Sequence, residues 1–297
     1  MPRLQAMLGD ERPFELEWVS IYTFQCRRMT DFRHGRVLFA GDAAHQVSPF
    51  GARGANSGFQ DADDLMWKLG LVIKGQASDK LLDTYAHDRQ FAADENIMNS
   101  TRSTDFITPK SRTSKTFRNQ VLALAKHHPF ARKLVNSGRL SVPSFLTGSV
   151  LNTPDADAFE GNMVPGAPMD DAPVQVEGQD AWLLDQVGKG FQLMLFVDAA
   201  PAPDVLAQLE SCRSAPSCAN VPVPVTPLIV TPHALDVPGM KVIVDAQGLV
   251  TKRYNATPGT TYLLRPDQHV VARWRQMDPA QLQAALSRAI GAHIGTA

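Results

Sequence analysis

The chain has 297 residues, a hydrophobic content of 44%, a charged content of 20% and a formal net charge of −1 at pH 7. At this length two domains are expected. The nearly balanced charge argues against a nucleic-acid partner, because a polyanion favours a clear basic excess. No apolar run is long enough to span a bilayer, and the first residues lack the apolar core of a signal peptide, so no membrane partner is expected.

The cysteines are few and widely spaced. Cys26, Cys212 and Cys218 are an odd number and contain no CxxC pair. Neither a disulfide framework nor a metal site is therefore indicated. The expected location is the reducing cytoplasm.

The first half of the chain reads as a strand followed by helices. Residues 36–41, "RVLFAG", are nearly all apolar and predict a strand buried on both faces of a parallel sheet. A helix should follow, capped by Asn56 or Ser57 and ended by Gly75. Its predicted buried stripe consists of Phe59, Ala62, Leu65, Met66, Leu69, Val72 and Ile73.

Two further helices are predicted before the middle of the chain. Residues 78–105 suit a long helix with Ser78 as its N-cap. Its apolar face should contain Leu81, Leu82, Tyr85 and Phe91. Residues 114–130 predict another helix, which should end before Pro129.

The composition then changes, and a second domain follows. Residues 137–173 are rich in Gly and Pro, so we expect a boundary near residue 155, with domains at 1–154 and 155–297. The second half predicts strand, helix, strand, two strands around Pro266 to Gln268, and a helix capped by Asp278. We expect "VPVPVTPLIVT", broken by prolines, to be an edge strand, and Trp182 and Trp274 to be core residues.

This order is typical of a thioredoxin-like α/β layer. A redox thioredoxin places CxxC after the first long strand, where this chain has "VDAAPAPD". A dithiol function is therefore not expected, and packing or oligomerisation is the simpler interpretation.

The most informative stretch joins the first strand to the first long helix. Asp42 stands at the carboxyl end of the strand, where ligands collect in parallel sheets. Its carboxylate could accept hydrogen bonds from ligand hydroxyls, or could simply cap the next turn. Gly51, Gly54 and Gly58 permit positive φ angles and a close approach of a ligand to the backbone; the alternative is a tight loop that binds nothing.

The start of the helix offers a second binding feature. The free amides of residues 54–56 and the positive end of the helix dipole suit an electron-rich group. Asp61, Asp63 and Asp64 read as acids at the helix start that offset this dipole. Together these residues predict a ligand with many hydroxyls and a delocalised negative end.

A family resemblance sharpens this prediction. "GRVLFAGDAAHQVSPFGARGANSGFQDADDLMWKL" is similar to the second flavin-binding motif of the single-component FAD-dependent aromatic hydroxylases. The second half resembles the third domain of the phenol hydroxylase and 3-(3-hydroxyphenyl)propionate hydroxylase branch. The resemblance implies an α/β fold, with part of a Rossmann-like FAD-binding domain and a thioredoxin-like domain. It also implies FAD as cofactor, NADPH or NADH as electron donor, and O2-dependent hydroxylation of a phenolic substrate.

The resemblance also implies roles for single residues. Asp42 would hold the ribityl hydroxyls of FAD, and Pro49 would lie over the reactive edge of the isoalloxazine ring. The backbone of Gly54, Ala55 and Asn56 would bind the pyrimidine carbonyl of the ring. Gly41 and Gly51 complete the expected cofactor-binding set.

Other residues near the motif receive weaker interpretations. No side chain is expected to act as an acid–base catalyst. His45 is expected to be packed or hydrogen-bonded, and Arg53 to face solvent, flavin or pyridine nucleotide.

The GxGxxG fingerprint of the family is not found before the motif. Only Gly9 and Gly35 precede Gly41, so the chain resembles the C-terminal portion of a hydroxylase. We therefore expect little bound flavin in the purified chain by itself. The alternative is a catalytically inactive binding or assembly module that needs a separate chain with GxGxxG; a homodimer is a further possibility. A thioredoxin-like redox protein is disfavoured by the missing CxxC.

Overall fold

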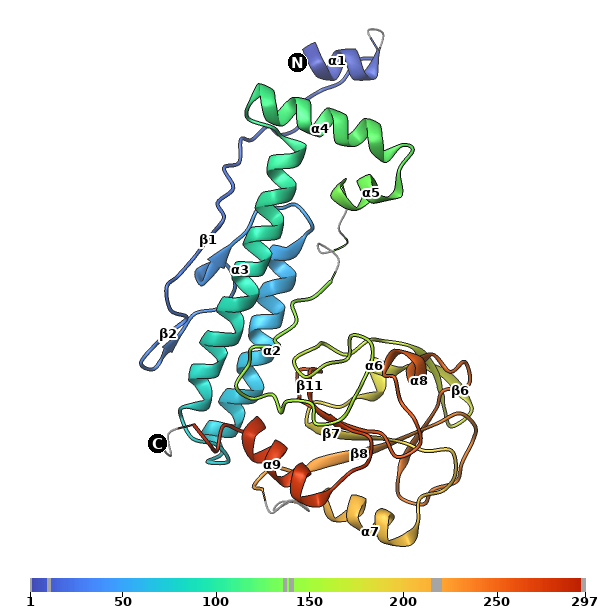
Figure 1. Ribbon diagram of the computed structural model, residues 1–297. Coiled ribbons are helices and arrows are strands. Elements are labelled where there is room, and N and C mark those ends of the chain that lie inside the picture. The colour runs from blue at the N-terminus through green and yellow to red at the C-terminus, as the bar shows by residue number, and fades with distance from the viewer. Residues whose placement is uncertain (1, 10–11, 136–137, 139–141, 215–220, 295–297) are drawn as a thin grey trace.

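The computed structural model describes residues 2–9, 12–135, 138, 142–214 and 221–294. Two long helices stand side by side, and a part built on one mixed sheet lies against their lower ends (Figure 1). The helices are α2 (Arg53–Ile73) and α3 (Leu81–Ile107), which run antiparallel. This arrangement places the N-terminus of α2 away from the turn that connects the two helices.

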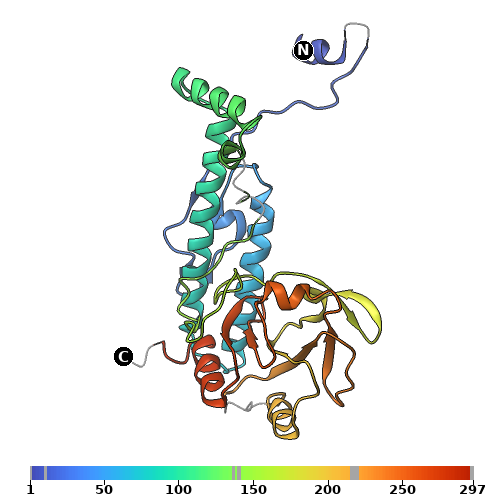
Figure 2. The ribbon, with the colours of Figure 1, turned by 45° about the vertical axis from the view of Figure 1, so that its right-hand side comes forward.

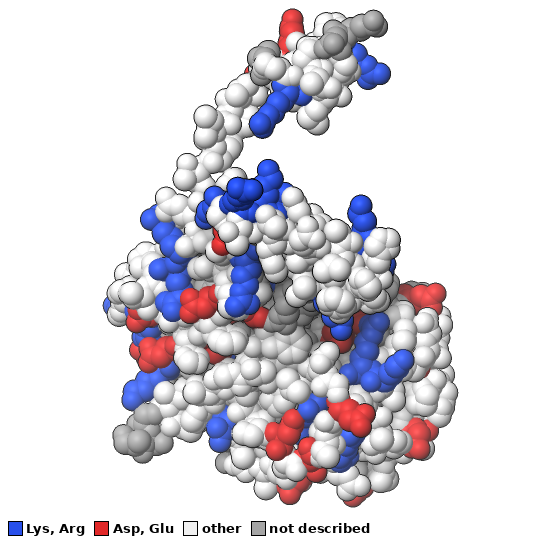
Figure 3. All heavy atoms as spheres, turned by 45° about the horizontal axis from the view of Figure 1, so that its top comes forward, with Lys and Arg blue, Asp and Glu red and all other residues white. Residues whose placement is uncertain are grey.

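Short elements surround this helix pair. They are α1 (Pro2–Leu8), β1 (Arg27–Arg28), β2 (Arg33–His34), β3 (Val37–Leu38), the 3-10 turn η1 (Gly41–Ala43), β4 (His45–Gln46), α4 (Arg112–Ala125) and α5 (Pro129–Val135). β1 pairs with β4 and β2 pairs with β3, both antiparallel. Helix α1 stands apart from the rest of the molecule (Figures 2 and 3). The helix predicted at residues 114–130 does end before Pro129, as expected.

The prediction of a buried parallel strand at residues 36–41 is wrong. Only Val37 and Leu38 are in a strand, and their one partner is the antiparallel β2. Val37 is 55% exposed. Within the described part of the chain no parallel strand flanks β3, so its side chains have no sheet neighbours to cover them.

Helix α2 starts earlier than predicted. It begins at Arg53 with Ala52 as N-cap, so the predicted caps Asn56 and Ser57 lie inside the helix. The predicted end is confirmed: Gly75 has a φ of +68° and donates its N–H to Val72.

The predicted buried stripe of α2 is only partly buried: Leu65, Leu69 and Val72 are half-buried, whereas the other four residues are exposed. Phe59, Met66 and Ile73 are 74%, 63% and 76% exposed. The buried residues are instead polar, namely Arg53, Ser57, Asp61, Asp64 and Lys68. They are buried because α3 and the sheet-based part offer them hydrogen-bond and ion-pair partners, which offset the cost of removing them from water.

Helix α3, in contrast to α2, starts later than predicted. It begins at Leu81 with Lys80 as N-cap, after a turn in which Leu81 donates to the Ser78 carbonyl. Leu81, Leu82 and Tyr85 are buried, as predicted. Phe91 is 45% exposed, because it lies on the side of α3 that faces away from α2 and the sheet.

The second half forms a seven-stranded sheet in the order β11-β10-β7-β8-β9-β5-β6. The strands are β5 (Pro173–Val176), β6 (Gln179–Trp182), β7 (Phe191–Phe196), β8 (Val225–Thr231), β9 (Lys241–Val244), β10 (Thr261–Leu264) and β11 (Val270–Trp274). The helices are α6 (Leu183–Gln186), α7 (Pro203–Ser211), α8 (Leu249–Arg253) and α9 (Pro279–Ala289). β7, β8 and β9 run parallel, and the other pairs are antiparallel.

Several predictions for this part are confirmed and others are wrong. Asp278 caps α9, accepting from the Ala280 amide at 2.7 Å, and Trp274 is buried. Trp182 is 54% exposed, because it ends the strand at the sheet edge. β8 is central and not an edge strand; Pro227 is tolerated there because β9 pairs with β8 only from Leu228 onward.

Other expectations stay predictions or need correction. The domain boundary near residue 155 and the thioredoxin-like assignment stay predictions. Cys212 takes part in a disulfide, contrary to the expectation from cysteine spacing. As for membrane spans, no helix in the described ranges combines the necessary length and apolar character.

Candidate functional site

The N-terminus of α2 is held in place by side chains of α3. Arg53 is buried and donates to Asn96 Oδ1 and, at 2.7 Å, to the carbonyl oxygen of Val142. Asn96 in turn donates to Ser57 Oγ at 2.6 Å. Arg53 therefore does not face solvent, and it anchors the first turn of the helix to α3 and to residue 142.

This helix start has no side-chain cap. Ala52, the N-cap, has a φ of +52° and offers no side-chain oxygen to the first-turn amides. A non-glycine residue in this left-handed region is strained. The N–H groups at the start of a helix need acceptors from elsewhere, so this turn favours an electron-rich ligand.

A pocket of about 350 Å³ opens beside the helix start. It is lined by Gly51, Arg53, Asn56, Ser57, Phe59, Gln60, Asn96, Val142, Pro143 and Ser144. Its walls combine polar side chains with the exposed ring of Phe59. A flat ring system with polar edges would match this mixture.

The 3-10 turn η1 brings Asp42 close to the same helix. Gly41 has a φ of +58°, and a Cβ built on Gly58 of α2 would lie 3.4 Å from the Gly41 Cα. The two glycines therefore permit the turn and the helix to approach closely. Asp42 itself is exposed, so its carboxylate is available to a ligand.

Beneath this turn lies a buried carboxylate, Asp61. Its Oδ2 accepts from the Gly41 amide at 2.9 Å and lies 2.7 Å from His45 Nε2. Its Oδ1 accepts from Arg89 Nε at 2.6 Å. The expectation that His45 is hydrogen-bonded is confirmed, whereas Asp61 is not an acid at the helix start.

The ionisation of Asp61 follows from these contacts. Burial opposes the charged form, but the hydrogen bond with His45 and the charge of Arg89 outweigh it, so the pKa of Asp61 is lowered. The sequence signal for this residue is the spacing of Arg53, Ser57 and Asp61, which places three polar side chains on one helical face.

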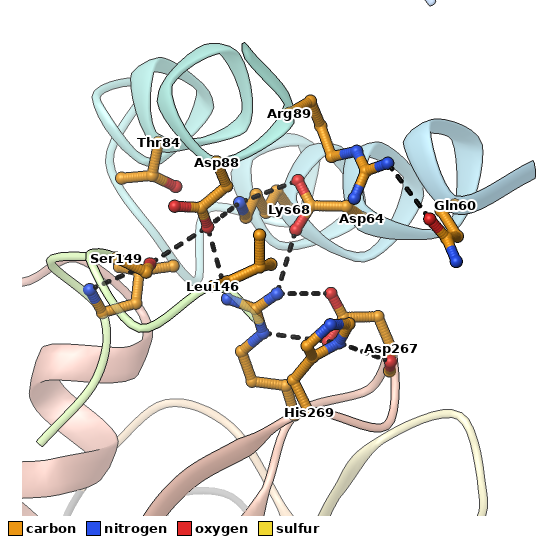
Figure 4. A network of polar contacts seen from close by, with 12 residues as sticks. Gln60, Asp64, Lys68, Thr84, Asp88, Arg89, Leu146, Ser149, Asp267 and His269 are labelled. Atoms are coloured by element: carbon orange, nitrogen blue, oxygen red, sulfur yellow. Dashed lines mark hydrogen bonds and ion pairs between the residues drawn. The ribbon is translucent and has the colours of Figure 1, made fainter. Parts of the chain in front are cut away.

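A second buried network joins α2 to the sheet-based part (Figure 4). Asp64 lies 2.8 Å from Lys68 Nζ and 3.1 Å from Arg265 Nη2. Arg265 is also 3.4 Å from Asp88 and 2.6 Å from Asp267. Arg265 comes from the end of β10, 201 residues after Asp64.

This network contains three carboxylates and two permanent cations. The carboxylates are Asp64, Asp88 and Asp267, and the cations are Lys68 and Arg265. Complete burial raises the pKa of Asp64 to about 6, although both cations favour its charged form. Asp64 therefore carries the surplus negative charge of this buried group.

The seven predicted cofactor-binding residues lie in η1, in the loop between β4 and α2, and in the first turn of α2. Gly51 and Asn56 line the pocket, while Gly41 and Asp42 lie at the second turn of the helix. Asp42, Pro49, Gly51, Ala55 and Asn56 are exposed, and Gly41 and Gly54 are half-buried. The Asn56 side chain donates back to the Ala52 carbonyl. Because α2 begins at Arg53, the Asn56 amide also has the Ala52 carbonyl as its acceptor within the helix, which leaves the amides of Gly54 and Ala55 for a ligand. The described residues hold no cluster suited to a metal ion.

Comparison with known proteins gives one family. Residues 3–100 match the family model described as an FAD binding domain. A 3-(3-hydroxy-phenyl)propionate/3-hydroxycinnamic acid hydroxylase of Mycolicibacterium gilvum is 30% identical over 98% of this chain and 52% of its own length. Tetracenomycin B2 monooxygenase-dioxygenase of Streptomyces olivaceus is 30% identical over 70% of this chain and 37% of its own length. The chain spans about half the length of the hydroxylases it matches over most of its residues.

Solved structures show the same fold. The flavin-dependent monooxygenase PieE, in complex with FAD and substrate, matches with a TM-score of 0.68 and 20% identity, over 91% of this chain and 50% of its own. Aklavinone-11 hydroxylase, in a complex with FAD and aklavinone, matches with a TM-score of 0.65 and 24% identity, over 98% of this chain and 51% of its own.

Proposed function

Because the chain belongs to the FAD-dependent aromatic hydroxylases, we propose that it forms the part of an FAD site that holds the ribityl chain and the isoalloxazine ring. In this proposal it serves an enzyme that uses NADPH or NADH and O2 to hydroxylate a phenolic substrate. The observation that carries the proposal is the uncapped start of α2, which opens on a pocket and lies close to the exposed Asp42.

The residues present fit this cofactor. The first-turn amides at Gly54, Ala55 and Asn56 have no side-chain cap, which suits the electron-rich pyrimidine end of the ring. Asp42 is an exposed acceptor, which suits the ribityl hydroxyls. The close contact of Gly41 with α2 holds these two features together.

The chemistry divides between cofactor and chain. When bound, FAD supplies the redox chemistry that passes an oxygen atom from O2 to the aromatic ring. Asp42 would fix the ribityl chain and the helix start would stabilise negative charge at the pyrimidine end. Pro49 and the side of Gly51 would cover the ring and exclude water. No side chain near the pocket is placed as an acid–base catalyst in this proposal.

The exposed face of α2 supports a protein partner. Phe59, Met66 and Ile73 are all more than 60% exposed along one side of the helix. Large apolar side chains gathered in this way favour contact with another protein surface. We include in the proposal a complementary chain or a second copy that covers this face.

The proposal is tested by titrating the purified chain with riboflavin, which contains the ribityl and isoalloxazine groups but no ADP. We expect saturable quenching of flavin fluorescence that becomes roughly ten-fold weaker in Asp42→Asn, because a charge-assisted hydrogen bond is lost. The matched control is Asp63→Asn, which changes an exposed carboxylate of α2. Riboflavin binding that is absent up to millimolar concentration, or equal in wild type and Asp42→Asn, would contradict the proposal.

A further inference from the structure

We propose that Asp61 is a positioning residue of the flavin site: its buried carboxylate fixes the η1 turn and thereby the direction in which Asp42 meets the ligand. The inference rests on the proposed function. It gives a role to a residue that the flavin motif does not place in contact with the cofactor.

Asp61 gathers donors from three separate elements. Gly41 belongs to η1, His45 to β4 and Arg89 to α3, while Asp61 itself belongs to α2. Asp61 has no exposed surface, and His45 and Arg89 are each only 3% exposed. Because water is excluded from this site, these hydrogen bonds are strong, and losing one of them should destabilise the fold.

The two residues that contact Asp61 Oδ2 lie on either side of Asp42 in the sequence. Gly41 immediately precedes Asp42, and His45 follows it by three residues. Between them the turn closes on itself, because the Ala44 amide donates to the Gly41 carbonyl at 2.9 Å. The chain is therefore tied to one oxygen atom of α2 on both sides of Asp42, through the backbone of Gly41 and the side chain of His45.

Helix α2 also sets how closely the η1 turn can approach it. Gly58 lies one turn before Asp61, and its backbone is in close contact with Gly41. Steric contact at Gly58 and hydrogen bonding at Asp61 together fix where Gly41 lies on α2. Because the start of α2 carries the amides of the ring-binding turn, one helix sets the position of both halves of the proposed flavin site.

An amide cannot replace this carboxylate. Asparagine has a single acceptor oxygen, whereas Asp61 uses both of its oxygens to accept. In Asp61→Asn either Arg89 or the Gly41 amide must face an NH2 group. Arg89 and the Gly41 amide are both donors that cannot accept, but the bond with the charged Arg89 is the stronger one, so the asparagine oxygen should face Arg89 and the NH2 group should face Gly41 and His45. His45 can change tautomer and accept, which leaves the Gly41 contact as the one at risk.

A double-mutant cycle tests the proposal. Riboflavin binding is measured in wild type, Asp61→Asn, Asp42→Asn and the double variant, with Asp63→Asn as the control on the same helix. We expect Asp61→Asn to weaken binding roughly ten-fold in the wild-type background and less than about two-fold when Asp42 is already changed. Equal losses in the two backgrounds, or no loss in either, would overturn the positioning role.

A ligand-free measurement separates this inference from the proposed function. Exchange of the Gly41 amide with solvent is followed by nuclear magnetic resonance in the same variants. We expect at least ten-fold faster exchange in Asp61→Asn and unchanged exchange in Asp42→Asn and Asp63→Asn. Unchanged Gly41 protection in Asp61→Asn refutes the inference, whereas a wild type with protected Gly41 but no riboflavin binding refutes the proposed function alone.

A second variant serves if Asp61→Asn does not fold. Asp61→Glu keeps the negative charge beside Arg89 but displaces the carboxylate oxygen from Gly41, so the same increase in the exchange rate of the Gly41 amide is expected.

Discussion

Asp61 and Asp64 lie one turn apart on the buried face of α2, yet their ionisation is shifted in opposite directions. The pKa of Asp61 is lowered, and the pKa of Asp64 is raised to about 6. Burial opposes the charged form of both residues. The difference comes from the balance of charge around each one, because Asp61 has its own Arg89 while Asp64 shares its cations with two other carboxylates.

This contrast assigns different properties to two regions of the helix. Around Asp61, next to the η1 turn, one carboxylate is paired with Arg89 and His45, and these partners favour its charged form. Around Asp64, where α2 meets β10, burial and the neighbouring carboxylates Asp88 and Asp267 disfavour the charged form of Asp64, so we expect this region to depend on pH. The proposed flavin site therefore lies next to the turn of α2 that contains Asp61. The next turn, which contains Asp64, contacts the sheet-based part and is the one expected to depend on pH.

The largest expected effect comes from removing the shared cation. Arg265→Ala leaves Asp64, Asp88 and Asp267 buried beside Lys68 and His269 without the cation that contacts all three, and should reduce the free energy of unfolding by about 3–5 kcal/mol. Urea unfolding at pH 7 measures this loss. The control is Arg253→Ala, which removes an exposed arginine at the end of α8 and should change stability by less than about 0.5 kcal/mol. A similar small loss in Arg265→Ala would mean that the buried network does not join the two parts.

A smaller effect, with a defined sign, is expected from pH. The pKa of Asp64 is raised in the folded chain, so the folded state holds a proton that the unfolded state has released between about pH 4 and pH 6. The contribution of Asp64 to stability therefore falls as pH rises through this window. The contribution of Asp61, whose pKa is lowered, is present above its unfolded pKa and is lost only as pH falls through the lower, folded value.

Asp64→Asn isolates the pH-dependent contribution. The free energy of unfolding of this variant minus that of wild type should increase by at least about 1 kcal/mol between pH 4.5 and pH 6.5, because wild type loses stability as Asp64 ionises and the asparagine cannot ionise. Asp61→Asn should show no such relative gain over the same window. A parallel pH dependence of wild type and Asp64→Asn would show that the pKa of Asp64 is not raised in the folded chain.

The sequence predicted those elements whose ends are marked by local chemistry. Pro129 ends a helix, Asp278 begins one and Gly75 closes α2, and each of these effects depends on residues within one turn. The start of α2 was misplaced because Asn56 and Ser57 are good caps by residue type, whereas the observed cap is a strained alanine. The flavin motif predicted which residues hold the cofactor, and these binding roles stay predictions.

The buried face of α2 could not be read from apolar periodicity. That periodicity locates an apolar face but does not say what covers it, and here Phe59 and Met66 are exposed. The polar face is buried because its partners come from distant parts of the chain, such as Arg265, which follows Asp64 by 201 residues. Local patterns carry no information about such pairs, although the spacing of Ser57, Asp61 and Lys68 on one face was present in the sequence.

The most direct test of the account is to map riboflavin on the chain by the changes it causes in amide chemical shifts. We predict that the largest shifts occur at Gly41, Asp42 and the first turn of α2, residues 53–56, with little change in strands β7 to β9. Shifts that are concentrated in the sheet-based part, with Gly41 and residues 53–56 unaffected, would contradict the placement of the flavin at the start of α2.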